Sequence, residues 1–253
     1  MIRVCLSGAR GRMGRILTEL LREDPALELT AALERPDHPE IGQAIAPKVR
    51  LEGEARPAIE RCDVLLDFGL PPAVREHLPL CREAKKPLVT GATGFDEQGR
   101  SELSRAAESI PIVWSANMSR GVQVLAELAR RAAAMLGGEY DAEIFEIHHR
   151  HKADAPSGTA LLLAERIRKA RGGEIRYGRE GRRAPDEIGL CSARGGDVVG
   201  EHQVMFFGGG EQILLIHRAS SREHFARGAL QAVRWIVGRS PGLYGMDDVF
   251  GGA

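Results

Sequence analysis

Three histidines, an arginine and a lysine occupy five consecutive positions near the middle of the chain, in the run His148-His149-Arg150-His151-Lys152. Imidazole is the side chain whose ordinary pKa lies closest to neutrality, so this run can exchange a proton at physiological pH. The neighbouring guanidinium and ammonium groups add positive charge that attracts an anion. These residue types at this spacing predict a site that binds an anionic substrate and transfers a proton.

The residues just downstream, Ser157, Gly158 and Thr159, are suited to holding a carboxylate. Ser157 is a typical helix N-cap, and a glycine in the first helical turn leaves backbone N–H groups open to an anion. Lys152 is one of only five lysines among 35 basic residues, which suggests a need for a compact or deprotonatable ammonium group. Together, Lys152 and the helix start predict a clamp for a dicarboxylate.

Two other functions remain open for the histidine run. Imidazoles are common zinc ligands, so a metal-assisted hydrolase is the alternative enzyme class. Two adjacent cations would repel a divalent ion, and Asp154 is the one acidic residue at a helpful spacing, so we expect no metal. The non-enzymatic alternative is a dinucleotide-sensing protein whose histidine run only binds an anion.

Residues 140–149 have the alternation of a strand, which determines where the two adjacent imidazoles point. On strict alternation His148 shares a face with Glu146 and Ile144, while His149 lies on the opposite face. Both imidazoles can reach one pocket only if the strand ends here. Pro156 and the polar residues before it support such an end.

A second chemical feature follows the first expected strand, residues 2–6. Gly8, Gly11 and Gly14 open the next helix, in a turn whose glycines allow a tight bend and close approach of a phosphate to the helix N-terminus. Glu34 lies 20 residues beyond Gly14 at the end of the second strand, where a carboxylate would accept hydrogen bonds from a ribose. Arg35 could pair with a 2′-phosphate, so NADH and NADPH are both admissible.

The first half of the chain alternates short apolar runs with amphipathic helical patterns. Strands are expected at 2–6, 27–33, 63–68, 87–90 and 110–114, with helices around 73–84 and 96–109. Repeated β-α-β units imply a parallel sheet covered on both faces, which is a Rossmann-type α/β domain.

After residue 117 the pattern changes. We expect a helix at 121–136, a helix at 157–169, a mobile loop at 171–185, and strands at 197–207 and 212–218 joined by a turn at Gly208–Gly210. These strands predict a smaller α+β domain with a mixed or antiparallel sheet. A helix at 222–237 would return to the first domain. The expected division is residues 1–119 with 228–253 for dinucleotide binding, and 120–227 for substrate binding and oligomerisation.

Composition limits the binding partners and the cellular compartment that we expect for this chain. The chain has 253 residues, enough for a large core, with 35 basic and 35 acidic side chains. The formal net charge is therefore zero, and no excess positive charge attracts nucleic acid or an anionic membrane. Neither partner is expected. The start of the chain lacks the pattern of a signal peptide, and four scattered cysteines fit reduced thiols. We expect a cytoplasmic protein.

The run from Glu146 to Ala160 resembles the signature of the 4-hydroxy-tetrahydrodipicolinate reductase (dihydrodipicolinate reductase) family of the diaminopimelate and lysine pathway. The resemblance extends along nearly the whole chain, through residues 11–14, 31–35, 91–95, 116–119, 194–202 and 219–222. It implies NADPH- or NADH-dependent reduction of 4-hydroxy-tetrahydrodipicolinate, via dihydrodipicolinate, to tetrahydrodipicolinate. It also implies a homotetramer.

The resemblance implies roles for individual residues. His148 would be the proton donor and Lys152 a second catalytic group, while His149, Ser157, Gly158 and Thr159 would contact the dicarboxylate. The implied cofactor residues are Gly8, Ala9, Arg10, Gly11, Arg12, Met13, Glu34, Arg35, Gly91, Ala92, Thr93, Ser115, Ala116, Asn117 and Met118. The chain departs from the family pattern at Ala92, Met118 and Ile147, where threonine, phenylalanine and a smaller residue are more usual.

Overall fold

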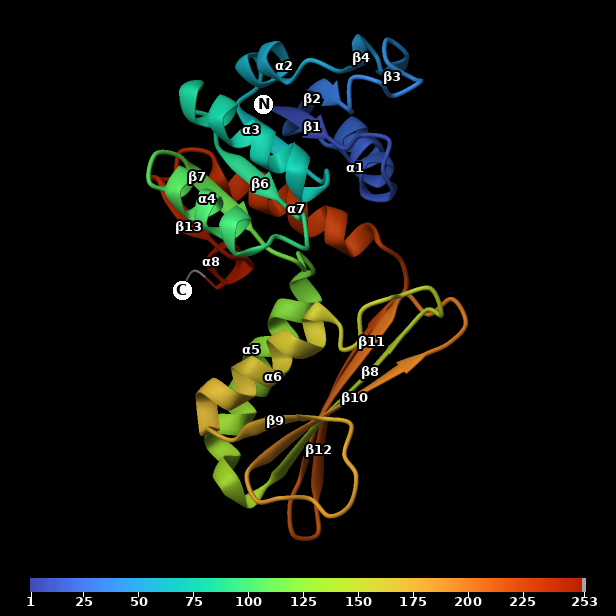
Figure 1. Cartoon of the computed structure of the whole chain (residues 1–253), viewed down its shortest axis with the longest axis vertical. Helices are drawn as coiled ribbons and strands as arrows, with labels where there is room; N and C mark the ends of the chain where they lie inside the picture. The colour runs from blue at the N-terminus through green and yellow to red at the C-terminus, as the bar shows by residue number, and fades with distance from the viewer. Residues whose placement is uncertain (252–253) are drawn as a thin grey trace. The chain divides into compact units, whose positions relative to one another are not determined.

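The computed structural model describes residues 1–251, and the chain forms two compact units (Figure 1). The first contains residues 1–119 and the segment that begins at Glu223; the second is Arg120–Arg222. The chain returns to the first unit at Glu223 rather than at the expected residue 228. The reason is that helix α7 (Glu223–Ile236) packs as a whole: Ala226 near its start and Ile236 at its end are both buried in the core of the first unit.

The first unit is built on a largely parallel sheet. Its strands are β1 (Ile2–Ser7), β2 (Leu27–Leu33), β3 (Ala44–Ala46), β4 (Val49–Glu52), β5 (Val64–Asp67), β6 (Leu88–Thr90), β7 (Pro111–Trp114) and β13 (Gly242–Tyr244). The order is β13-β7-β6-β5-β1-β2-β4-β3, and β3 alone in this set runs antiparallel to its neighbour. Strands β2 and β4 are added on one side of β1, and β5, β6 and β7 on the other, so the strand order switches at β1, between β2 and β5. Ligands of such sheets bind at the carboxyl ends of the strands near this switch point.

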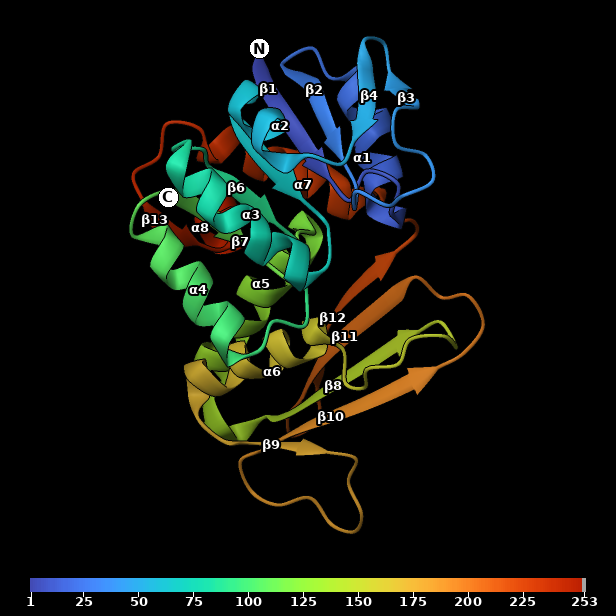
Figure 2. The same ribbon diagram turned by 45° about the horizontal axis from the view of Figure 1, so that its top comes forward.

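Helices cover the first sheet on both faces, as expected (Figure 2). Because side chains alternate along β1, Val4 and Leu6 enter one apolar core and Cys5 enters the other. The core containing Leu6 is closed by α1 (Arg12–Glu23), α7 and α8 (Met246–Phe250), and the core containing Cys5 by α2 (Ala55–Arg61), α3 (Pro71–Glu83) and α4 (Glu97–Ala107). Five short elements of this unit were not predicted from the sequence: β3, β4, α2, β13 and α8.

The second unit carries the expected mixed sheet. Its elements are α5 (Arg120–Leu136), the short helix η1 (Gly137–Glu139), β8 (Asp141–His148), α6 (Gly158–Arg171), β9 (Glu174–Tyr177), β10 (Glu187–Arg194), β11 (Gly200–Phe207) and β12 (Gln212–Ala219). The order is β12-β11-β8-β10-β9. Strands β8, β9 and β10 are parallel, while β11 is antiparallel to β8 and β12. Helices α5 and α6 share an apolar core with this sheet.

Two parts of this unit differ from expectation. The segment expected to be a mobile loop contains β9, an edge strand with mostly exposed side chains, which a pattern based on apolar residues does not reveal. Strand β10 lies beside β8 and was not predicted at all. In the part of the chain that the structure describes, no helix is both long and apolar enough to cross a membrane.

Candidate active site

Strand β8 carries Glu146 and His148 on its buried face. The side chains alternate between buried and half-buried along the strand, so Ile144, Glu146 and His148 point the same way and Ile147 points the other. Glu146 has no exposed surface and His148 is 9% exposed. The strand ends at His148, and His149 begins the connection to α6.

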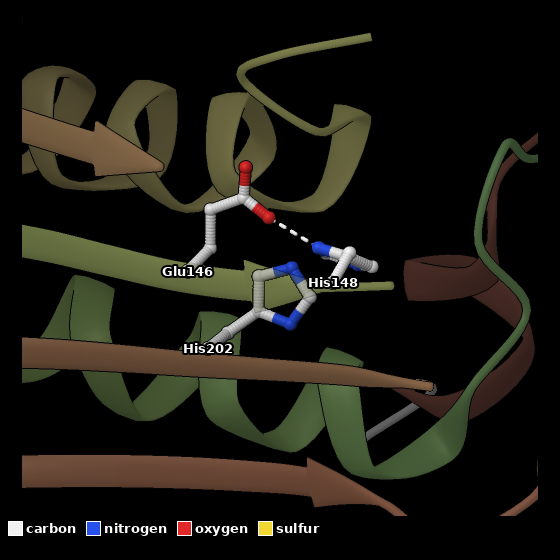
Figure 3. Close-up of side chains that lie close together, drawn as sticks. All are labelled: Glu146, His148 and His202. Carbon is white, nitrogen blue, oxygen red and sulfur yellow. Dashed lines mark hydrogen bonds and ion pairs between the residues drawn. The ribbon is translucent and has the colours of Figure 1, made fainter. Parts of the chain in front are cut away.

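The Glu146 carboxylate lies at the centre of a hydrogen-bond network. One oxygen, Oε2, contacts Nδ1 of His148 (Figure 3). The other, Oε1, accepts hydrogen bonds from the backbone N–H of Ser157 at 3.2 Å and from Nη2 of Arg194 at 2.9 Å. Burial works to raise the pKa of Glu146, but its hydrogen bonds with His148, Ser192 and Arg194 prevail and hold that pKa well below its usual range. The group is therefore a buried carboxylate with charged and polar partners.

This carboxylate defines the hydrogen-bonding state of His148. An ionised carboxylate only accepts hydrogen bonds, so Nδ1 of His148 carries a proton and donates a hydrogen bond to Glu146. Nε2 then faces away from Glu146, close to Gly200 at the start of β11, where a Cβ atom would lie 3.0 Å from it. When the imidazole is protonated, the second proton is at Nε2 and is available for donation.

A second buried histidine, His202, faces this pair from β11. It pairs directly with Glu146 in the antiparallel register, and its ring centroid lies 5.1 Å from that of His148, edge to face. Its Nε2 is 3.1 Å from Oγ of Ser157. Burial, followed by the nearby charge of His148, lowers the pKa of His202 to about 3. His202 is therefore neutral at physiological pH.

The connection from β8 to α6 is held by the end of β10. The backbone N–H of Gly195 donates to the carbonyl of His148 at 2.9 Å, and Nη2 of Arg194 donates to the carbonyl of Asp154 at 2.6 Å. Within this connection, Nζ of Lys152 contacts both carboxylate oxygens of Asp154, at 2.8 and 2.9 Å. Lys152 is thus positioned by an exposed acid that an incoming carboxylate could replace.

The remaining residues of the predicted clamp lie at the start of α6. Ser157 is the N-cap, and its Oγ accepts from the backbone N–H of Ala160 at 3.2 Å. Thr159 is buried, whereas Gly158 is exposed, and a Cβ atom added to Gly158 would meet no other atom within 4 Å. His149 is half-buried; burial and then the charge of Arg222 lower its pKa. The helix start therefore has open space in front of its first turn.

Glu146, His148 and His202 also have the composition of a metal site. One ligand atom from each lies within 4.8 Å of the others. These donors already have other partners, since His148 binds Glu146 and His202 binds Ser157. The Arg194 guanidinium on Glu146 adds a positive charge that would repel a divalent cation. This arrangement favours a hydrogen-bonded proton-transfer site over a cation site.

The predicted cofactor residues of the first unit lie at the carboxyl ends of parallel strands. Gly8 follows β1 with φ +73°, and a Cβ atom there would lie 2.9 Å from the Phe68 carbonyl group. Gly14 approaches the turn so closely that its Cβ would be 2.1 Å from the Gly8 carbonyl oxygen. This is a tight turn with glycine at the points of closest backbone approach, as a dinucleotide pyrophosphate requires, so these residues fit such a cofactor.

Glu34 contacts this glycine turn directly. Its Oε1 accepts the backbone N–H of Arg10 at 2.9 Å, while the Arg10 side chain forms an ion pair with Glu40 at 2.7 Å. Arg35 is exposed and pairs with Asp37 at 3.2 Å. Ala9 is buried beneath the turn, and Gly11, Arg12 and Met13 lead into α1.

The other two predicted cofactor segments follow β6 and β7. Gly91, Ala92 and Thr93 come after β6, and the backbone N–H of Ala92 is held by Oγ1 of Thr90 at 3.2 Å. Ser115, Ala116, Asn117 and Met118 come after β7, and the backbone N–H of Ser115 donates to the carbonyl of Thr90 at 3.2 Å. The Met118 side chain is buried in the core beside α7. Both segments therefore lie at the carboxyl ends of the strands, as the glycine turn does.

Glu146, Arg194 and His202, which surround His148, have no role that the sequence pattern alone predicts. For Glu146 there was a signal, because alternation places it on the His148 face. Arg194 and His202 lie in segments that contributed to the resemblance, but no local spacing connects them to His148. Their contacts depend on the pairing of β8 with β10 and β11.

Comparison with known proteins gives the same family along both units. Residues 2–118 match the profile described as dihydrodipicolinate reductase, N-terminus, and residues 121–250 match its C-terminal counterpart. A 4-hydroxy-tetrahydrodipicolinate reductase from Thiobacillus denitrificans is 46% identical over 263 aligned positions, covering 99% of this chain and 98% of the relative. One from Acinetobacter baumannii is 43% identical and covers 98% and 96%.

Solved structures agree with the sequence relatives. A dipicolinate-bound dihydrodipicolinate reductase from Paenisporosarcina sp. TG-14 superposes with a TM-score of 0.81 at 27% identity, covering 97% of each chain. GenD2 from gentamicin A biosynthesis, solved in complex with NAD, reaches a TM-score of 0.64 at 14% identity. At that identity the second likeness concerns the fold alone.

Proposed function

The chain belongs to the dihydrodipicolinate reductase family, and we propose that His148 is the acid that protonates the substrate during its reduction. The activity is that of a 4-hydroxy-tetrahydrodipicolinate reductase, an oxidoreductase of lysine and diaminopimelate biosynthesis. Most of the first unit, residues 2–118, matches the family's N-terminal domain, whose fold implies use of NAD(P)H. A bound nicotinamide supplies the hydride, and the residues described below bind the substrate and deliver the proton.

The observation that carries this proposal is the contact between Nδ1 of His148 and the buried Glu146 carboxylate. The carboxylate accepts from Nδ1 and keeps the imidazole in one orientation, so Nε2 is the nitrogen that donates. Such a buried acid partner is not needed for a histidine that merely contributes positive charge. His202, neutral and packed edge to face on His148, adds no competing charge to this side of the imidazole.

For the dicarboxylate, we propose a clamp made by Lys152, His149 and the first turn of α6. The ammonium of Lys152 would leave Asp154 for a substrate carboxylate, which is a stronger partner once water is excluded. Ser157 caps the helix, while Gly158 and Thr159 present backbone and hydroxyl donors to the second carboxylate. The dipicolinate bound by the Paenisporosarcina relative is a dicarboxylate of this kind.

We propose that the dinucleotide binds along the glycine turn Gly8–Met13, with Glu34 and Arg35 at the adenosine ribose. Residues 91–93 and 115–118 would border the nicotinamide. The close approach of Gly14 to Gly8 and the contact of Glu34 with the turn support this assignment. Both NADH and NADPH are proposed as cofactors, since Glu34 suits a ribose hydroxyl and Arg35 suits a 2′-phosphate.

We propose a separate function for each unit. The first unit binds the dinucleotide, and the second binds substrate and forms the contacts of a homotetramer. We also propose that the enzyme works in the cytoplasm, where a biosynthetic reductase meets reduced nicotinamide and where its cysteines stay reduced.

The substitution His148→Gln tests the proton donor. We expect turnover to fall by ~10²–10⁴, the usual contribution of a general acid, while NADPH and pyridine-2,6-dicarboxylate bind about as well as in the wild type. Turnover is followed by NADPH absorbance, with the aldol product of pyruvate and aspartate semialdehyde as substrate. The matched control is His151→Gln, an exposed histidine of the same run. Unchanged turnover in His148→Gln would remove His148 as the acid.

A further inference from the structure

A second buried carboxylate–imidazole pair lies in the first unit, away from the histidine run. Asp67, the last residue of β5, has no exposed surface, and its Oδ2 is 2.6 Å from Nδ1 of His77 on α3. His77 is itself 8% exposed. Taking such a pair out of water is costly, and replacing it with apolar side chains is often neutral or stabilising. Its presence calls for a role beyond stability.

The other oxygen of Asp67 holds the loop that follows β5. Oδ1 of Asp67 accepts the backbone N–H of Gly69 at 2.8 Å. On the preceding residue, the backbone N–H of Phe68 donates to the carbonyl of Ser7 at 3.1 Å. Phe68 is therefore fixed on both sides, by β1 through its own N–H and by Asp67 through the next residue. His77 in turn fixes the orientation of the Asp67 carboxylate.

Phe68 lies between the two glycine segments of the first unit. Its carbonyl group would be 2.9 Å from a Cβ atom on Gly8, in the glycine turn. Its ring carbon Cε1 would be 2.4 Å from a Cβ atom on Gly91, in the segment after β6. Both glycines thus leave space that Phe68 occupies. A shift of Phe68 would displace the surfaces of both segments at once.

We propose that Asp67 and His77 are positioning residues for the dinucleotide: they fix Phe68 as the spacer that sets the glycine turn and the Gly91 segment relative to each other. The inference rests on the proposed function, which assigns both segments to the cofactor. The pair acts through Phe68, and neither member needs to contact the cofactor. Loss of the pair should therefore weaken dinucleotide binding while the proton-transfer residues of the second unit keep their contacts.

The test measures the Kd of NADH and NADPH by titration calorimetry, together with steady-state constants. Asp67→Asn and His77→Gln each remove the charged contact, and we expect both to raise the Kd and KM for NADH roughly tenfold, with kcat at saturating NADH within about twofold of wild type. His77→Asn places an amide nitrogen where Nδ1 lies and should restore most of the affinity. A merely structural role would lower the melting temperature of Asp67→Asn and His77→Gln without this split between KM and kcat.

The matched control is Asp63→Asn, the same chemical change just before the opposite end of β5. Asp63 binds the Arg3 backbone and guanidinium, far along the strand from the glycine turns, so its loss should leave the NADH Kd unchanged. Wild-type NADH affinity in Asp67→Asn, or in His77→Gln if Asp67→Asn does not fold, would overturn the inference. Failure of the wild type to bind either dinucleotide would instead overturn the proposed function on which it rests.

Discussion

At the scale of single residues, the acid chemistry of the second unit depends on charge that is buried but not unpaired. Glu146 has four hydrogen-bond partners, His148, Ser157, Ser192 and Arg194, so its negative charge is retained without water. The same carboxylate therefore orients the imidazole of His148 and anchors the N-cap of α6. A change at Glu146 reaches both the proposed proton donor and the proposed substrate clamp.

Replacing Glu146 with glutamine separates these two roles. The amide keeps the shape and can still accept from Ser157, but it carries no negative charge. The Arg194 guanidinium then faces the site without its counter-ion. We expect kcat to fall by at most the ~10²–10⁴ of the acid step, while pyridine-2,6-dicarboxylate binds about as well as in the wild type because the hydrogen bond to Ser157 is kept. Wild-type kcat in Glu146→Gln would show that the charge of Glu146 has no part in the acid step.

His202 makes the second unit sensitive to acid. Its folded-state pKa of about 3 lies below the ordinary value of about 6.5, so the unfolded chain binds a proton where the folded chain does not. The contribution of His202 to the free energy of unfolding is therefore fully present above about pH 6.5 and is lost as the pH falls toward 3. His149 acts in the same direction, whereas the lowered pKa of Glu146 contributes only below about pH 4.3.

We therefore expect the melting temperature of the wild type to fall by several degrees between about pH 7 and 5, and by less in His202→Gln. The glutamine amide can keep the hydrogen bond to Ser157, so the comparison isolates the proton. Differential scanning calorimetry across this range provides the measurement, with His151→Gln as the control because His151 is exposed. Parallel slopes for wild type and His202→Gln would contradict the assignment of the acid sensitivity to His202.

At the scale of elements, the start of α6 combines a satisfied cap with an open first turn. Ser157 is fully used by Ala160 and His202, while Gly158 has nothing near its missing side chain. Alanine favours helix over glycine by up to ~1 kcal/mol, so Gly158 is not explained by stability. The absence of a side chain at this exposed position is explained if a substrate carboxylate approaches the backbone there.

The substitution Gly158→Ala distinguishes these explanations. We expect the melting temperature to stay the same or rise slightly, while the KM for substrate rises at least fivefold because the methyl group occupies the carboxylate's space. Gly209→Ala in the β11–β12 turn is the control, since a Cβ atom there also meets nothing within 4 Å. A stabilised Gly158→Ala enzyme with wild-type KM would show that the carboxylate binds elsewhere.

The elements that sequence could predict are those whose pattern is local. β2 was expected at its observed bounds because its buried residues are all apolar and recur from Leu27 to Leu33, and the faces of β8 followed from alternation. β10 was missed although it has a neighbour on each side, because Gly189 interrupts its apolar run. A Cβ atom at Gly189 would lie 1.9 Å from the Glu143 carboxylate, which would have to move.

The contacts of the site that were not predicted join residues far apart in the sequence. Arg194 meets Glu146 48 residues further along the chain, and His202 meets Ser157 across 45 residues. Such contacts depend on strand register, which is set by the turns and by the match of buried faces across the sheet. Local spacing therefore predicted an anion clamp and the resemblance implied the donor, while the residues that hold them required the three-dimensional pairing.

At the scale of the whole molecule, the second unit has an apolar surface that the described chain leaves uncovered. Strand β12 is an edge of the mixed sheet, and Ile213, Leu214 and Ile216 on it are 37%, 45% and 46% exposed. An exposed apolar edge strand favours association with another chain. This surface is where we expect contacts of the proposed homotetramer.

The substitution Leu214→Glu tests that expectation by adding a charge to this edge. Burying an unpaired carboxylate costs several kcal/mol, so the variant should elute as a smaller species than the wild type in size-exclusion chromatography with light scattering. The control is Leu243→Glu on β13, an edge strand of the other sheet with a similarly exposed leucine, 42%. If Leu214→Glu remains a tetramer while Leu243→Glu dissociates, the subunits associate through the first unit, and the oligomerisation role proposed for the second unit is wrong.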